Sequence, residues 1–386
     1  MKYSFADCVL DETGHTLSRA GQPVAVEPLV FDLLLLLARQ AGELVTRDQM
    51  IEVLWQGRAV SDSAITACIA AARKAVGDDG KKQAIIRTVA RRGLQLIAPV
   101  TSDDDFVPEQ GLQAPNIRYT QSATGQSLAY AIVGDGPPVV RMYPGSHLEV
   151  EWNTAREQAL FELICRRNRL LRLDPIGIGM SDRKLERFDF DDMAEDIRIA
   201  ADAAGLNEFI LCSESGGVHA ALRCAAKYPN RVSRLAILGG YVDGRSRRAA
   251  DQSSDFLHVM LKELTDNSDE GLLRAFALTY FSDGPIEEAN AHARVIQASA
   301  NRDIQMKSRK AINEVSNAHL LAEIQCPTLI VHGKSDPVHP LSEAQKLATG
   351  IRNSELLVLE TANSLPLPGH HSWATFAPAF RAFLDA

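Results

Sequence analysis

The sequence predicts a chain of two domains that differ in fold class: an α+β domain over residues 1–100 and a larger α/β domain over residues 117–386. Short alternating strands and three helical stretches fill the first hundred residues. A polar, acidic segment punctuated by Pro and Gly follows at residues 101–116 and is typical of a linker. Beyond it, apolar strand-like runs alternate with helical ones, which favours a mostly parallel sheet with helices on both faces.

Composition narrows the class of protein. No stretch resembles a membrane-spanning helix, because the most apolar run, residues 29–38, is short and contains Asp32. The first residues lack the apolar core of a signal peptide. Six scattered cysteines form no C-x-x-C pair, which indicates buried thiols and not a disulfide framework or a zinc site. We therefore expect a cytoplasmic protein with no membrane partner.

The first domain begins with alternating residues that predict short antiparallel strands up to about residue 24. Pro28 then opens a helix with apolar residues at helical spacing. Thr46 is a plausible N-cap for a second helix over residues 47–55, and Ser61 for a third over residues 62–76. Residues 85–89 and 93–96 predict a hairpin that closes the domain.

This order of elements resembles the winged-helix effector domain of OmpR/PhoB-type response regulators and ToxR/CadC-type activators. The resemblance covers essentially all of residues 2–98, and the segments that carry it are 28–34, 45–50, 54–55 and 86–89. It implies that the third helix enters the major groove of double-stranded DNA and that the hairpin, or wing, touches the backbone or the minor groove. It also implies a homodimer, since such regulators often bind repeated half-sites.

Charge supports a contact with a polyanion. Residues 1–100 carry 12 Lys and Arg against 11 Asp and Glu, and eight of the twelve lie between Arg58 and Arg92, whereas the rest of the chain carries 29 against 38. The residues expected to meet DNA are Thr66, Arg73 and Lys74 on the third helix, and Arg87, Arg91 and Arg92 on the wing. A winged helix used for contact with another protein is the alternative.

The second domain is organised around a serine. An apolar run from Phe209 ends in Ser213-Glu214-Ser215-Gly216-Gly217, and a helix-like segment follows. A sharp turn from a strand into a helix strains the backbone of the serine at its apex. The residues two before and two after that serine must therefore be small. Ser215 is therefore a candidate nucleophile, and an ordinary strand-to-helix turn is the alternative.

Residues 117–386 resemble the α/β-hydrolase fold. The segments that carry the resemblance are 143–146, 174–181, 213–217, 228–232, 326–336 and 369–370. Residues 241–325 lie where this family inserts a cap, and their helical character indicates a cap that shapes a ligand pocket.

A serine hydroxyl is a weak nucleophile that needs an imidazole to accept its proton, and the imidazole needs a carboxylate to orient it. In this fold the three occur in the order Ser, acid, His. Ser215, Asp336 and His370 give that order. A turn-capping role for Asp336 and the neighbouring His371 as the base are alternatives. Four more histidines fit structural or pocket positions: His147, His219, His332 and His339.

The negative charge that develops in acyl transfer needs two preorganised donors. By resemblance, these are the backbone N–H groups of Ser146 and Gly216. Glu214, beside the candidate nucleophile, could disfavour anionic substrates or point to solvent. No cofactor or metal is implied, because the chemistry needs neither.

Three functions remain open from the sequence. The first is a one-component transcriptional regulator in which the second domain senses a small, largely apolar ligand such as an ester, lactone or amide. The second is a working serine esterase or lactonase with an accessory DNA-binding domain. The third is a pseudoenzyme whose pocket only binds.

Overall fold

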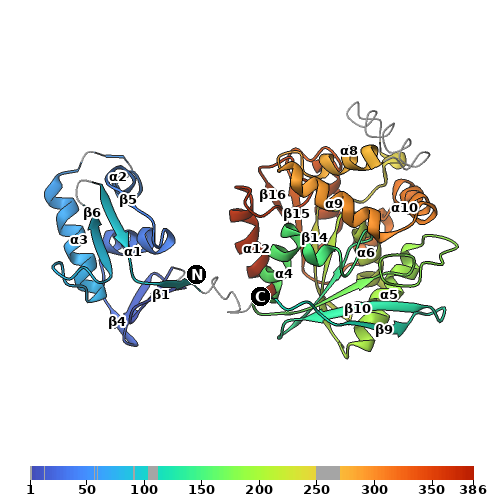
Figure 1. The fold of residues 1–386 in the computed structure, drawn as a ribbon, viewed down its shortest axis with the longest axis horizontal. Coiled ribbons are helices and arrows are strands. Elements are labelled where there is room, and N and C mark those ends of the chain that lie inside the picture. The colour runs from blue at the N-terminus through green and yellow to red at the C-terminus, as the bar shows by residue number, and fades with distance from the viewer. Residues whose placement is uncertain are drawn as a thin grey trace. The chain divides into compact units, whose positions relative to one another are not determined.

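The computed structural model describes residues 2–12, 14–55, 57–58, 60–89, 92–102, 112–248 and 270–386. The chain separates into two compact units, Met1–Glu109 and Gln110–Ala386, each with its own hydrophobic core (Figure 1). The division falls inside the segment that the sequence predicts as a linker. Each unit is described by itself below.

The first unit opens with an antiparallel sheet in the order β4-β3-β2-β1-β8. Its strands are β1 (Lys2–Phe5), β2 (Cys8–Asp11), β3 (Thr16–Arg19), β4 (Gln22–Val24) and β8 (Val100–Ser102). Strand β8 pairs with β1, so Tyr3 lies opposite Ser102. The predicted linker therefore begins inside this strand, because residues 100–102 close the sheet on the chain's own first residues.

Three helices and a hairpin complete the first unit: α1 (Pro28–Arg39), α2 (Arg47–Trp55), α3 (Asp62–Val76), and the strands β5 (Val45–Thr46), β6 (Ile86–Val89) and β7 (Gly93–Leu96), in the order β5-β7-β6. The predicted bounds of α2 and α3 are confirmed. The Ser61 hydroxyl accepts a hydrogen bond from the Ala64 N–H at 3.3 Å, and Gly77 ends α3 in the left-handed conformation. Local caps thus fix both ends of α3.

The second unit is built on an eight-stranded sheet in the order β16-β15-β14-β13-β11-β12-β10-β9. Its strands are β9 (Ile117–Gln121), β10 (Ser127–Val133), β11 (Pro138–Met142), β12 (Arg169–Asp174), β13 (Phe209–Glu214), β14 (Val232–Leu238), β15 (Thr328–Gly333) and β16 (Ser354–Leu359). Strands β11 to β16 pair in parallel, and β10 runs antiparallel to both of its neighbours. The predicted mostly parallel sheet is confirmed.

Helices cover both faces of this sheet (Figure 1). One face packs against α4 (Ala155–Cys165) and α12 (Trp373–Asp385), and the other against α5 (Phe190–Ala203), α6 (Val218–Lys227) and α11 (Leu341–Gly350). Neighbouring residues of one strand enter opposite cores: Val139 faces the α4 side and Val140 the α5 side. The central strands are therefore largely apolar on both faces, as expected for a sheet buried on both sides.

Among the described residues between β14 and β15, within the segment predicted as a cap, lie the α-helices α8 (Glu270–Tyr280), α9 (Ile286–Ser299) and α10 (Arg302–Glu314). The short turn η3 (Arg245–Arg247) precedes them. In the part of the chain that the structure describes, no helix is both long and apolar enough to cross a lipid bilayer.

Candidate functional site

Ser215 lies at the turn between β13 and α6. Its backbone φ is +47°, in the left-handed region that residues with a Cβ rarely adopt. The turn also demands Gly217, because a Cβ there would lie 2.5 Å from the Met142 carbonyl oxygen on the neighbouring strand. Strain at the serine and close backbone approach two residues later are the properties of a nucleophile elbow.

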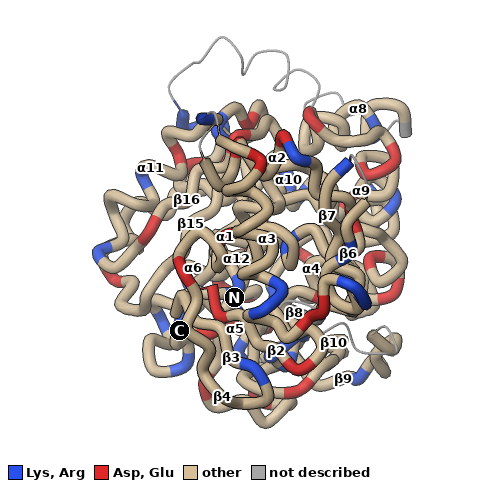
Figure 2. The backbone as a smooth tube through the Cα atoms, turned by 90° about the vertical axis from the view of Figure 1, so that its left-hand side faces the viewer, with Lys and Arg blue, Asp and Glu red and all other residues tan. Residues whose placement is uncertain are grey.

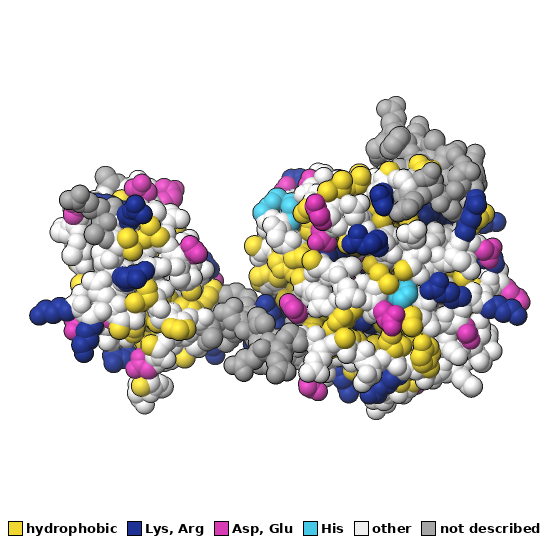
Figure 3. Space-filling view, viewed as in Figure 1, with side chains coloured by type: hydrophobic (Ala, Val, Ile, Leu, Met, Phe, Trp, Pro, Cys, Tyr) yellow, Lys and Arg dark blue, Asp and Glu magenta, His cyan; other side chains and the backbone are white. Residues whose placement is uncertain are grey.

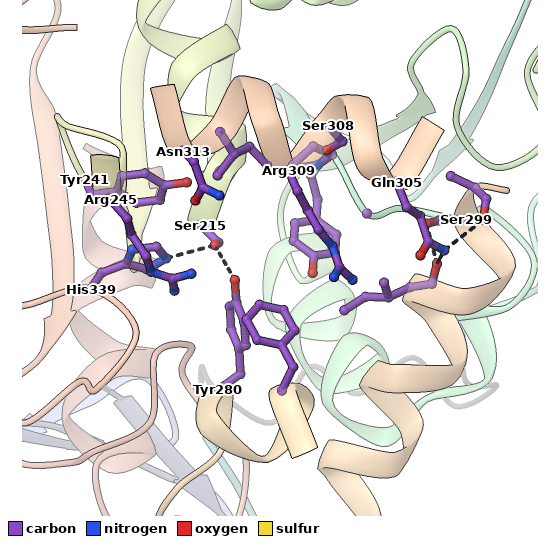
Figure 4. Close-up of a pocket in the computed structure, with 18 of the residues that line it drawn as sticks. Ser215, Tyr241, Arg245, Tyr280, Ser299, Gln305, Ser308, Arg309, Asn313 and His339 are labelled. Atoms are coloured by element: carbon purple, nitrogen blue, oxygen red, sulfur yellow. Dashed lines mark hydrogen bonds between the residues drawn. The ribbon is translucent and has the colours of Figure 1, made fainter. Parts of the chain in front are cut away.

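A cavity opens over Ser215, with about 870 Å³ of empty space including its mouth. That volume lies within the range of small-molecule sites. Its floor includes Ser215 and Gly216, and its walls come from α8, α9 and α10. Apolar and aromatic side chains share the lining with polar ones, which lie both beside Ser215, as His339 and Arg245 do, and further along the cavity, as Arg309 and Gln305 do (Figure 4).

The Ser215 hydroxyl has two partners (Figure 4). Its Oγ lies 3.4 Å from Nε2 of His339 and 3.3 Å from the Tyr280 hydroxyl. His339 is buried and stacks on Tyr241 with ring centroids 3.9 Å apart. The imidazole that meets the candidate nucleophile therefore comes from the loop after β15.

The other ring nitrogen of His339 determines what this imidazole can do. Nδ1 lies 3.2 Å from Nη2 of Arg248. A guanidinium only donates hydrogen bonds, so Nδ1 must accept, and the single proton of the neutral ring is assigned to Nε2. Nε2 then donates to Ser215 and has no lone pair with which to accept the serine proton. This is the opposite of the tautomer that a general base needs.

The charged form of His339 is also disfavoured. Burial, followed by the positive charges of Arg248 and Arg245, holds the pKa of His339 well below its ordinary value. A base that takes the serine proton becomes an imidazolium, and here that cation would lie beside two guanidiniums.

Asp336 does not orient an imidazole beside Ser215. Its Oδ1 accepts the backbone N–H groups of Val338 and His339, at 2.8 and 3.2 Å, and the hydroxyl of Ser364 at 2.6 Å. Its Oδ2 lies 3.6 Å from His332, whose Nε2 also meets the His339 carbonyl oxygen at 2.8 Å. The turn-capping alternative thus describes what this carboxylate does, and Ser364 takes the contact that a triad imidazole would make.

His370, the predicted base, lies elsewhere. Its Nδ1 meets the Ser372 hydroxyl at 2.8 Å, its ring stacks near His371, and the side chain is half-buried outside the cavity lining. In the structure it is His339, and not His370, that lies within reach of Ser215. The loop after β16 reaches Asp336 with Ser364, and the six further residues carry His370 away along the chain.

The two predicted oxyanion donors differ in position. Gly216 lines the cavity beside Ser215. The Ser146 N–H is instead used in a turn, where it donates to the Tyr143 carbonyl oxygen at 3.3 Å, and it is Gly145 that reaches the cavity. Of the predicted pair, only Gly216 lies where a ligand could meet it.

Glu214 points into the protein and not to solvent. It is fully buried, forms an ion pair with Arg156 at 2.6 Å and accepts a hydrogen bond from Arg141. We call the six buried side chains joined here the charge cluster: Arg141, Arg156, Arg172, Glu151, Glu157 and Glu214. Burial raises and the two arginines lower the pKa of Glu214, which settles at about 2. The negative charge of Glu214 therefore takes part in ion pairs inside the protein, beneath the turn at Ser215.

Replacement of Arg248 by Met should raise the pKa of His339, because a neighbouring positive charge is removed. The value should stay below the ordinary one, since burial is the larger cause. The measurement is a pH titration of the imidazole nitrogens by ¹⁵N NMR, which also reports the tautomer. Arg247→Met, on the exposed side of the same turn, is the control. An unchanged His339 in Arg248→Met would refute the tautomer assignment.

In the first unit, α3 presents a solvent-exposed face that includes Thr66 and Lys74. The Thr66 hydroxyl donates to the Asp62 carbonyl oxygen at 2.8 Å within the helix. Arg87 and Arg92 are exposed on and after β6, and Arg91 lies outside the described residues. Basic positions along the backbone are marked in Figure 2, and basic side chains project from the visible face in Figure 3.

Arg73, predicted to meet DNA, makes hydrogen bonds within the first unit. Its guanidinium donates to the Ile86 carbonyl oxygen at 3.0 and 3.3 Å and to the Thr88 hydroxyl at 2.8 Å. These bonds join α3 to strand β6 of the hairpin. Lys74, one residue on, is the exposed cation of the pair.

The cavity cations Arg245, Arg248 and Arg309 were not predicted from the sequence, and His339 was predicted only as a structural or pocket residue. One signal was available: the basic run 245–248 lies in the segment after β14, and His339 lies in the loop after β15. Because the carboxyl ends of parallel strands meet at one edge of a sheet, both segments belong beside Ser215.

Comparisons with known proteins agree with the two-unit fold. Residues 21–96 match the family model described as "Transcriptional regulatory protein, C terminal", and residues 146–367 match that of the "alpha/beta hydrolase fold". The AB hydrolase superfamily protein YisY of Bacillus subtilis is 26% identical over 246 residues, which is 58% of this chain and 84% of that protein. The transcriptional activator CadC of Escherichia coli is 34% identical over 85 residues, 22% of this chain and 17% of that protein.

Among solved structures, an esterase from Exiguobacterium antarcticum superposes with a TM-score of 0.59 at 21% identity, covering 69% of this chain and 99% of that one. That likeness concerns the fold alone. The hydrolase model covers more than half of the chain, and the regulator model covers the helices and wing of the first unit. The chain therefore belongs to the alpha/beta hydrolase fold family and carries a DNA-binding domain of the OmpR/PhoB regulator type at its N-terminal end.

Proposed function

We propose that this protein is a one-component transcriptional regulator whose hydrolase-fold unit binds a small molecule without cleaving it. The observation that carries the proposal is the arrangement around His339. Arg248 occupies Nδ1, so Nε2 donates to Ser215, and the carboxylate of Asp336 is engaged by Ser364. Catalysis would require an imidazole that accepts the serine proton at one nitrogen and donates to a carboxylate from the other. The hydrogen bonds of His339 do not have this arrangement.

In this proposal the cavity over Ser215 is the site where the ligand binds. A ligand bound over Ser215 would contact α8, α9 and α10 at once, since all three line the walls. A ligand changes DNA binding only if it prefers one conformation of the protein over another. The cap helices are the elements whose arrangement such a ligand would bias.

The regulator-type domain supplies the output. The exposed face of α3, with Lys74 and Thr66, is presented to the major groove, and Arg87 and Arg92 approach phosphates from the wing. Arg73 joins α3 to strand β6. Dimerisation on repeated half-sites belongs to this proposal and would be seen as binding of two chains per DNA fragment.

An active esterase is the second candidate. The strained backbone of Ser215 favours it, because a binding pocket alone does not need this strain. It predicts ester turnover on the order of 1 to 1,000 per second. The regulator proposal predicts that DNA affinity changes with ligand while esters are left intact.

Binding to DNA should weaken steeply with salt, because phosphate contacts release counterions. Lys74→Ala should weaken binding to all sequences alike and reduce the slope of log K against log salt by about one. Fluorescence anisotropy on duplexes selected from a random pool by the full chain measures both. Lys2→Ala, in strand β1 away from α3 and the wing, is the control. A salt-independent affinity would remove the phosphate contacts from the proposal.

A further inference from the structure

The cavity over Ser215 contains more positive charge than its own walls balance. Three arginines line it: Arg245 and Arg248 from the segment after β14, and Arg309 from α10. Among the described residues that line the cavity there is no Asp or Glu. The sequence suggested a largely apolar, neutral ligand, and this excess of cations points to a different class.

The three arginines are not equally engaged. Arg248 donates to the carbonyl oxygens of Asp243 and Val338 and to His339, and it lies 4.0 Å from the carboxylate of Glu343 outside the lining, so its charge and its donors are already engaged. Within the part of the chain that the structure describes, Arg245 makes one long hydrogen bond, from Nη2 to the Val338 carbonyl oxygen at 3.4 Å.

Arg309 is the least satisfied of the three. Its Nη1 is buried and has no hydrogen-bond partner among the described residues, and its guanidinium lies 5.8 Å from the Phe276 ring centroid. Figure 4 shows Arg245 and Arg309 reaching into the cavity on either side of Ser215. Two incompletely paired guanidiniums thus face one space.

Burying unpaired charge is unfavourable, and a bound anion is the direct way to compensate for it. A guanidinium fork matches the two oxygens of a carboxylate. The rest of the wall, including Phe276, Ile296 and Ile312, is apolar and suits a hydrocarbon body.

We propose that the ligand is an amphipathic organic acid. Its carboxylate lies between Arg245 and Arg309, and its apolar body packs against the cap helices. This assignment rests on the proposed function, because it names the ligand class of the same sensor site. It also gives Ser215 a role as a polar neighbour of the bound acid in place of a nucleophile.

The test is isothermal titration calorimetry of the full chain with a panel of carboxylates, namely hexanoate to dodecanoate, phenylacetate and cinnamate. Each acid is paired with its primary amide, and alkyl phosphates of matched length form a third arm. At least one acid should bind, and its amide should bind at least about tenfold more weakly, because charged hydrogen bonds are the stronger ones.

Arg309→Gln should weaken acid binding about ten- to hundredfold and amide binding by a smaller factor, because only the acid loses a charged hydrogen bond. Arg309→Lys should retain part of the affinity, since it keeps the charge and loses the fork. Lys310→Gln, exposed on the same helix, should bind as the parent does, and thermal unfolding checks that every variant is folded.

The ligand assignment is overturned if no acid in the panel binds, if amides bind as tightly as acids, if phosphates alone bind, or if Arg309→Gln has no effect. Hydrolysis of the matched methyl esters is followed in the same samples. Ester turnover at the rates of serine hydrolases would overturn the proposed function itself, whatever the acids do, so the two failures are distinguishable.

Discussion

A fluorophosphonate probe is expected to leave Ser215 essentially unmodified in the purified protein. These probes report a serine whose proton is removed by a neighbouring imidazole, and in the tautomer assigned from the Arg248 contact the nitrogen that faces Ser215 carries a proton of its own. In a Ser-His-Asp enzyme, holding the imidazole in the wrong tautomer lowers kcat by about 10⁴. The labelling rate of Ser215 should fall below that of an active serine esterase by a comparable factor.

Mass spectrometry of the labelled protein locates any modified residue. An active esterase treated in parallel is the positive control, and Ser215→Ala sets the background. Labelling of Ser215 at the rate of the esterase would show that His339 changes its hydrogen-bond partners in solution. That result would favour the second candidate function, an active esterase.

Glu214→Ala should lower the free energy of unfolding by about 3–5 kcal/mol, which is the usual cost of removing one partner from a buried ion pair. Arg141 and Arg156 would then be buried beside one carboxylate fewer. Urea unfolding at pH 7 followed by circular dichroism measures the change. Glu208→Ala, exposed near the start of the same strand, should change stability by less than about 0.5 kcal/mol.

Glu214→Gln separates charge from shape, because the amide fills the same space and keeps one acceptor. The free energy of unfolding of Glu214→Gln should lie between that of the parent and that of Glu214→Ala. The pKa of Glu214 is about 2 in the folded protein against an ordinary 4.5, so its stabilising contribution is present above pH 4.5 and is lost as the pH falls towards 2. Equal stability of Glu214→Ala and Glu208→Ala would contradict the importance of the charge cluster.

The parts of the fold that could be predicted were those with local determinants. Ser61 and Gly77 cap the two ends of α3, and apolar residues at helical spacing fill the interval, so its bounds followed from the sequence. The elbow could also be predicted, because only small residues allow the chain to turn at Ser215. Strand β8 could not, since its pairing with β1 joins residues a hundred positions apart.

The candidate site was predictable only in outline. Chain order indicated that loops after β13, β15 and β16 meet at one edge of the sheet, but it could not say which histidine reaches Ser215. That depends on how many residues each loop uses: His339 is three residues past Asp336, and Ser364 reaches that carboxylate before His370 can. The tautomer of His339 depends on Arg248, a residue some ninety positions earlier, and such a contact leaves no local pattern.

The charge cluster has a bearing on how a signal could leave the pocket. Its six members come from β11, β12, β13, α4 and the turn before α4, so buried ion pairs join these elements beneath Ser215. A movement of one of these elements relative to the others would separate several ion pairs at once. In the proposed regulator, a bound ligand would therefore act more easily on the cap helices above Ser215 than on the strands beneath it.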